Sequence, residues 1–118
     1  MRLVLLAKTP ELSLVGALRA AGHDVWYLKP NPDAYRQARD AFPAAVLIDL
    51  AKEAEGGFAA AAELAANVRT KSVPVLLFNA QDVASARAKA PYVRTLLLAP
   101  SRHSDLVWAL TAFDVQED

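Results

Sequence analysis

The chain has 118 residues, of which 54% are hydrophobic, so it is long enough to form one domain around an apolar core. Its 13 basic and 13 acidic residues cancel, which argues against binding to nucleic acid or to an anionic membrane surface. Cysteine is absent and there are 2 histidines, which excludes thiol catalysis, disulfide frameworks and zinc sites of the Cys/His type.

An apolar run at residues 3–7 is too short for a signal peptide or a membrane span. We therefore expect a single cytoplasmic domain over residues 1–118, without an output domain. Four further apolar runs bring the number of expected strands to five. The runs are mostly unbroken, as in parallel strands that are covered on both faces. They are residues 3–7, 25–28, 44–50, 73–78 and 93–99.

Helix signals fill each gap between these runs. Thr9 and Pro10 predict the start of a first helix that ends at Gly22, where glycine can adopt a left-handed turn. Further helices are expected at about residues 31–41, 58–69, 82–90 and 104–115, the last with Ser104 and Asp105 as caps. The apolar stripe expected for the third helix is Phe58, Ala61, Ala65 and Val68.

Strict alternation of strands and helices predicts a three-layer α/β sandwich. Right-handed crossovers and coverage of both faces favour a flavodoxin-like, doubly wound (βα)5 fold, with a five-stranded parallel sheet of order 2-1-3-4-5. A ligand site is then expected at the carboxyl ends of the first and third strands, where the strand order reverses. Asp49, which ends the third run, lies there.

Several segments resemble the receiver domain of two-component response regulators, over essentially the whole chain. They are MRLVLLAK, AAVLIDL ending near Asp49, Gly57 eight positions after that acid, VPVLLFNA and LLLAP. The resemblance implies that Asp49 is equivalent to the aspartate that accepts phosphate in the presence of Mg²⁺.

The chain departs from that family at the residues that surround the phosphate. No acid falls at the end of the first strand, where Lys8 stands in one alignment. Asn79 replaces the usual Thr or Ser, and Ala99 replaces the usual Lys. Phosphoryl transfer depends on neutralising charge, and one carboxylate holds Mg²⁺ poorly. We therefore expect a pseudo-receiver that is not an enzyme and binds no metal or other cofactor.

Three interpretations of Asp49 remain open. It can accept hydrogen bonds from backbone N–H groups of the following loop. It can pair with Lys8, whose ammonium group would then stand in for the metal. It can also be phosphorylated after all, as in a working receiver. A separate alternative is a flavodoxin-like domain that binds a small anion with Lys8, Asn79 and Ala99.

The last helix carries a candidate interface. Trp108 falls roughly opposite its apolar face and is predicted to be exposed, either lying flat on its own helix or anchoring a contact. The resemblance implies a protein partner or a homodimer through the fourth helix, fifth strand and fifth helix, where Ala84 and Ala88 permit close approach. The apolar face itself consists of Leu106, Ala109, Leu110 and Phe113.

The two histidines, His23 and His103, are expected at the surface without acidic partners. Ser101, His103 and Asp105 are too close in sequence to form a catalytic triad.

Overall fold

The computed structural model describes residues 1–9, 11–31, 33–52, 54–93 and 95–116. Strands and helices alternate strictly along this part of the chain, as predicted. The strands are β1 (Arg2–Leu6), β2 (Asp24–Leu28), β3 (Ala45–Asp49), β4 (Val75–Ala80) and β5 (Thr95–Leu98). The helices are α1 (Leu12–Ala20), α2 (Ala34–Asp40), α3 (Ala54–Ala66), α4 (Val83–Lys89) and α5 (His103–Gln116).

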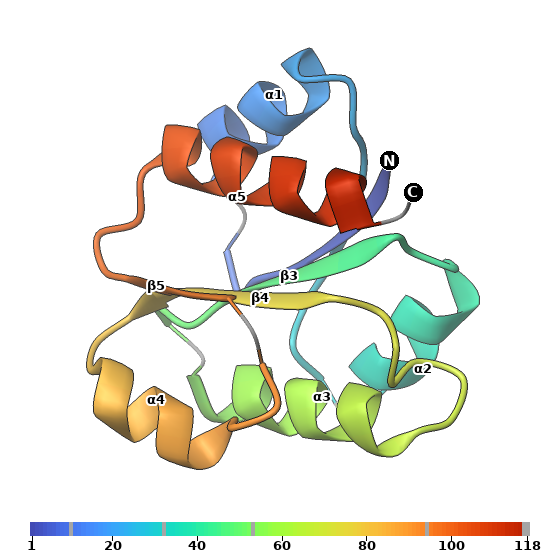
Figure 1. Cartoon of the computed structure of the whole chain (residues 1–118), viewed down its shortest axis with the longest axis vertical. Helices are drawn as coiled ribbons and strands as arrows, with labels where there is room; N and C mark the ends of the chain where they lie inside the picture. The colour runs from blue at the N-terminus through green and yellow to red at the C-terminus, as the bar shows by residue number, and fades with distance from the viewer. Residues whose placement is uncertain (10, 32, 53, 94, 117–118) are drawn as a thin grey trace.

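The five strands form one parallel sheet of order β2-β1-β3-β4-β5, which confirms the predicted flavodoxin-like topology. In Figure 1, α1 and α5 lie on one face of the sheet, and α2, α3 and α4 lie on the other. Both faces are therefore covered, as the unbroken apolar runs require. None of the described helices has the length and apolarity needed to cross a membrane.

The core is divided by the sheet into two clusters. Because successive side chains of a strand point to opposite faces, Leu47 packs with α1 and α5, whereas Val46 and Ile48 pack with α2, α3 and α4. All three of these side chains are buried. The central strands are thus fixed from both sides, and their carboxyl ends have fixed positions relative to one another.

The starts of α1 and α5 differ from the prediction. The helix α1 begins at Leu12, with Glu11 at the cap position and no side-chain cap, so Thr9 does not initiate it. Pro10 lies outside the described residues. At its other end, Gly22 has φ 95°, the left-handed conformation that was predicted for it. The helix α5 begins at His103, and Asp105 accepts a hydrogen bond from the backbone N–H of Arg102, whereas Ser104 lies within the first turn.

The third helix was predicted four residues too late, and its buried stripe was identified only in part, since Ala61 is buried and Phe58 packs against the core. Val68 lies beyond the end of α3 and is exposed. Three of the four buried residues of α3 are small, and the helix packs very closely on β3 at Gly57. The four buried residues are Gly57, Ala60, Ala61 and Leu64.

Gly57 is the point of closest approach. A Cβ atom at this position would lie 2.8 Å from Cγ2 of Ile48 and 3.0 Å from Cδ2 of Leu50. The Ile48 atom is branched directly from Cβ on a buried strand and cannot rotate away freely. The absence of a side chain at Gly57 therefore sets the distance between α3 and β3.

Gly57→Ala is expected to lower the free energy of unfolding by about 1–2 kcal/mol, because the cost of overpacking exceeds the gain in helix propensity. Urea denaturation measures the change. Gly16→Ala in α1 is the matched control, since a Cβ there meets no atom within 4 Å. That substitution should raise stability by about 0.5–1 kcal/mol. Equal effects of the two substitutions would contradict the close contact of α3 with β3.

Candidate functional site

Asp49 lies half-buried at the carboxyl end of β3. Its Oδ1 atom accepts two hydrogen bonds, from the backbone N–H of Ala51 at 2.9 Å and from Nδ2 of Asn79 at 3.0 Å. The first of these closes an Asx turn at the start of the β3–α3 loop. One of the three interpretations, that Asp49 accepts a hydrogen bond from an N–H group of the following loop, is therefore present in the structure. Asn79 on β4 is an additional partner.

Asn79 connects Asp49 to the loop that follows β5. Its Oδ1 atom accepts from the backbone N–H of Ser101 at 2.8 Å, and its own N–H donates to Oγ of Ser101 at 2.9 Å. The Ser101 hydroxyl in turn donates to the carbonyl of Leu98 at 2.9 Å. A continuous set of hydrogen bonds therefore runs from β3 across β4 to the β5–α5 loop, and Asp49 is its only charged member.

The backbone of Asn79 is left-handed, with φ 59°. It lies where the pairing of β4 with β5 shifts register, between Leu77 and Ala80. Asparagine tolerates this conformation better than most residues with a Cβ. The same residue type thus satisfies both the local backbone and the two side-chain contacts.

Ser101 was not predicted from sequence to take part in this site. It was considered only as a member of a rejected triad. The only feature of the sequence that pointed to Ser101 was its position two residues after Ala99. Its pairing with Asn79 depends on the parallel arrangement of β4 and β5, which brings the two residues together.

The other two predicted residues of the degenerate pocket do not contact Asp49 through their side chains. Ala99 is half-buried, and its N–H donates to the carbonyl of Ala80 at 2.8 Å. Lys8 is exposed in the loop after β1, and no ion pair joins it to Asp49 in the described part of the chain. The Lys8 ammonium group therefore does not take the place of a metal ion beside Asp49 in the structure.

The fold family implies Mg²⁺, and the donor set here does not fit it. Within residues 1–9, 11–31, 33–52, 54–93 and 95–116, no cluster of three or more acidic or histidine side chains is arranged to hold a metal ion. Glu11, the nearest acid along the chain from β1, directs Oε1 to Nε2 of His103 at 3.3 Å. A hard divalent ion needs several oxygen ligands, and Asp49 would supply a single carboxylate.

Both histidines, predicted to be surface residues, are partly exposed, and both have partners in the structure. His103 pairs with Glu11 and joins the starts of α5 and α1. Nδ1 of His23 lies 3.3 Å from the amino group of Met1. These partners are far away in sequence, so the neighbours of each histidine along the chain did not reveal them.

Tyr27 fixes the loop that carries Lys8. Its hydroxyl, on the edge strand β2, donates to the carbonyls of Ala7 at 2.7 Å and Lys8 at 3.1 Å. Burial raises the pKa of Tyr27 above its ordinary value. The end of β1 is thus held to β2 by a group that must be protonated to donate.

Asn79→Ala should lower the free energy of unfolding by about 2–4 kcal/mol, because it removes two side-chain contacts and places alanine in a left-handed conformation. Asn79→Gly loses the same contacts without the backbone penalty. It should therefore be more stable than Asn79→Ala by about 1 kcal/mol in urea denaturation. Wild-type stability in Asn79→Ala would contradict the bridging role.

Tyr27→Phe should cost about 0.5–1 kcal/mol at neutral pH, because the two carbonyls lose their donor. The folded state holds the Tyr27 proton more tightly than the unfolded state does, so the unfolded state binds fewer protons at alkaline pH. Wild-type stability should then be maintained below about pH 10 and fall as the pH rises further, and it should fall less in Tyr27→Phe.

Tyr92→Phe is the control for this measurement. Burial also raises the pKa of Tyr92, but its hydroxyl donates to no other described residue. Chemical denaturation from neutral to alkaline pH should show no loss at neutral pH for this variant. A neutral-pH loss equal to that of Tyr27→Phe would argue against the specific role of the Tyr27 hydroxyl.

Neither protein-family models nor curated proteins give a match to the sequence. Solved structures match its fold. The receiver domain of the sensor histidine kinase PA1611 from Pseudomonas aeruginosa PAO1, which has a magnesium ion coordinated in its active-site cleft, gives a TM-score of 0.80 at 21% identity over 95% of both chains. A signal receiver domain of a histidine kinase from Clostridium thermocellum gives 0.79 at 15% identity over 95% of both chains.

The Vibrio cholerae chemotaxis protein CheY4 gives a TM-score of 0.78 at 14% identity, over 95% of this chain and 97% of that one. At these identities the likeness concerns the fold. With the sheet order and the position of Asp49 already established, the chain has the receiver-domain fold of response regulators.

Proposed function

We propose that this chain is a pseudo-receiver, which acts in cytoplasmic signalling by protein–protein contact and without Mg²⁺-dependent phosphorylation of Asp49. The proposal treats residues 1–118 as one receiver-like domain that catalyses no reaction. The observation that carries it is the hydrogen-bonded chain from Asp49 through Asn79 to Ser101. Neutral groups occupy the places where a phosphorylated site needs positive charge.

Chemistry at the site supports this function. A phosphoryl group on Asp49 would add negative charge beside the neutral carboxamide of Asn79, which already contacts the carboxylate. Receiver phosphorylation depends on cations that neutralise this charge. Lys8, the cation that one alignment places at the end of the first strand, is exposed and has no ion pair with Asp49 among the described residues. The Asp49 carboxylate is better explained as a cap of its own loop.

A surface around the edge strand β5 supports the protein-contact part of the proposal. In Figure 1, α4 and α5 lie on opposite faces of the sheet, and both flank β5. We call this region the α4–β5–α5 surface. Its exposed apolar side chains include Trp108, which is 73% exposed as predicted, and Leu98, which is 54% exposed. Ala84 and Ala88, also exposed, give α4 a low profile.

An exposed aromatic side chain is typical of the anchors of protein interfaces. The Trp108 carbonyl accepts from the hydroxyl of Thr111 at 2.6 Å, so this part of α5 is ordered while the indole ring faces solvent. The partner that we propose for this surface is a second copy of the chain or another signalling protein.

Intact-mass measurement tests the phosphorylation half of the proposal. The protein incubated with acetyl phosphate and Mg²⁺ should keep its mass, because no cation stabilises a phospho-aspartate. Asp49→Asn is the control. A gain of one phosphoryl group in the wild type that is lost in Asp49→Asn would sink the proposal and establish a working receiver.

Sedimentation analysis tests the interface half. Trp108→Ala should raise the dissociation constant of the dimer by about tenfold or more, as expected for loss of an aromatic anchor. Leu12→Ala is the matched control, because Leu12 is 78% exposed but lies on α1, outside the α4–β5–α5 surface. If the wild type stays monomeric at high concentration, or if the two variants behave alike, a homodimer through Trp108 is excluded.

A further inference from the structure

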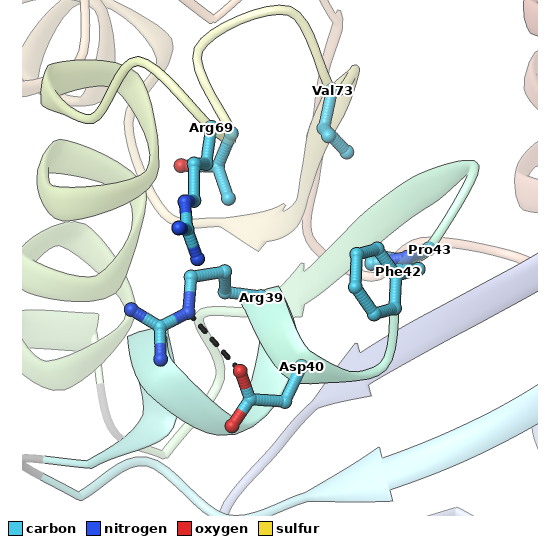
Figure 2. Close-up of a pocket in the computed structure, with 7 residues that line it drawn as sticks. Arg39, Asp40, Phe42, Pro43, Arg69 and Val73 are labelled. Atoms are coloured by element: carbon cyan, nitrogen blue, oxygen red, sulfur yellow. Dashed lines mark hydrogen bonds and ion pairs between the residues drawn. The ribbon is translucent and has the colours of Figure 1, made fainter.

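A second concave region lies at the other end of the sheet, at the amino ends of β3 and β4. The α2–β3 loop and the α3–β4 loop form its walls, as Figure 2 shows. The cavity has a volume of about 650 Å³, within the range of small-molecule sites. Its lining consists of Arg39, Asp40, Phe42, Pro43, Arg69, Thr70 and Val73.

Hydrogen bonds hold both walls of this cavity. Nη1 of Arg2 donates to the carbonyl of Ala41 at 2.9 Å and fixes the end of α2. On the other wall, Thr70 is buried, and its hydroxyl donates to the carbonyl of Leu64 at 2.7 Å. The N–H of Val73 donates back to the carbonyl of Thr70 at 2.9 Å. Both walls of the cavity are thus held by contacts within the chain.

Phe42 is the least expected residue of the lining. It has φ 50°, a left-handed conformation that is unfavourable for a bulky side chain, and its ring is 82% exposed. The ring contributes little to the core, so packing does not explain this strained position. Backbone strain of this kind is often found at functional sites. Together with Pro43 and Val73, Phe42 gives the cavity an apolar wall.

The cavity also contains an uncompensated positive charge. Nε of Arg39 lies 3.1 Å from Oδ1 of Asp40, so these two side chains largely neutralise each other. Arg69 projects from the opposite wall toward Arg39 (Figure 2). It is exposed, and no described residue forms an ion pair or hydrogen bond with its guanidinium group. A free guanidinium group is well suited to bind a carboxylate through two hydrogen bonds.

We propose that this cavity binds a small aromatic carboxylate, with the ring of the ligand against Phe42, Pro43 and Val73 and the carboxylate on Arg69. The site is independent of the function proposed for Asp49, which lies at the opposite end of the sheet. The apolar wall supplies affinity for the ring, and Arg69 supplies selectivity for the anion.

NMR titration of the backbone amides tests the site, with 2-naphthoate as the probe and neutral 2-naphthamide as its matched analogue. Naphthoate should shift the amides of residues 39–42 and 69–73 in a saturable way, with a Kd below about 1 mM. Naphthamide should bind at least about tenfold more weakly, because it cannot pair with the guanidinium group. Equal binding of the two probes, or saturation at other amides only, would overturn the proposal.

Charge variants identify the residue that binds the carboxylate. Arg69→Gln should raise the Kd for naphthoate by about tenfold. Arg36→Gln should leave it unchanged, because Arg36 lies on α2, pairs with Asp33 at 3.9 Å and does not line the cavity. If both substitutions raised the Kd for naphthoate equally, the effect would come from the overall charge of the protein, and the role of Arg69 would be refuted.

Phe42→Asn separates binding from stability. Asparagine accepts a left-handed backbone more readily, and the Phe42 ring is mostly exposed, so the midpoint of urea unfolding should stay at or above that of the wild type. The Kd for naphthoate should nevertheless rise. Loss of stability with unchanged naphthoate binding would show that Phe42 is structural and would refute its part in the site.

Discussion

The close contact between α3 and β3 is the constraint on which both ends of the molecule depend. Gly57 allows the helix to lie directly against Ile48, and the buried alanines on the same helix face extend this contact. The first turn of α3 then determines where the β3–α3 loop runs, and with it the N–H of Ala51 that contacts Asp49. The loop after its last turn carries Thr70 and Arg69 to the second cavity.

The carboxyl end of the sheet holds the carboxylate of Asp49, whose hydrogen-bond partners are neutral groups. In a receiver, a metal ion and a lysine balance an acidic cluster. Here one carboxylate remains, and an amide satisfies it. Hydrogen bonds to an ionised group contribute roughly 1.5–3 kcal/mol each, so two neutral donors can stabilise a half-buried Asp49 without a metal. Among the described residues, the lack of an ion pair at Asp49 and the lack of a cluster of acids around it are thus mutually consistent.

Much of the fold could be predicted from the sequence, because it depends on local patterns. Unbroken apolar runs predicted the parallel strands. The position of Trp108 opposite the apolar face of its helix predicted that its side chain is exposed. The start of α3 was predicted wrongly because Gly57 and two alanines form its buried face, while the larger Phe58 and Val68 suggested another stripe. Contacts between distant segments were beyond such patterns, as the pairing of Asn79 with Ser101 illustrates.

The length of α3 has a consequence for communication within the domain. Its 13 residues extend for about 20 Å between the Asp49 loop and the Arg69 wall. That span is more than twice the Debye length of about 8 Å at physiological ionic strength. The charge of a ligand bound at one end is therefore largely screened at the other end. A signal carried by α3 as a rigid body would require the helix to slide along β3. The tight fit at Gly57 opposes such sliding, which makes the two ends of this small domain separate sites.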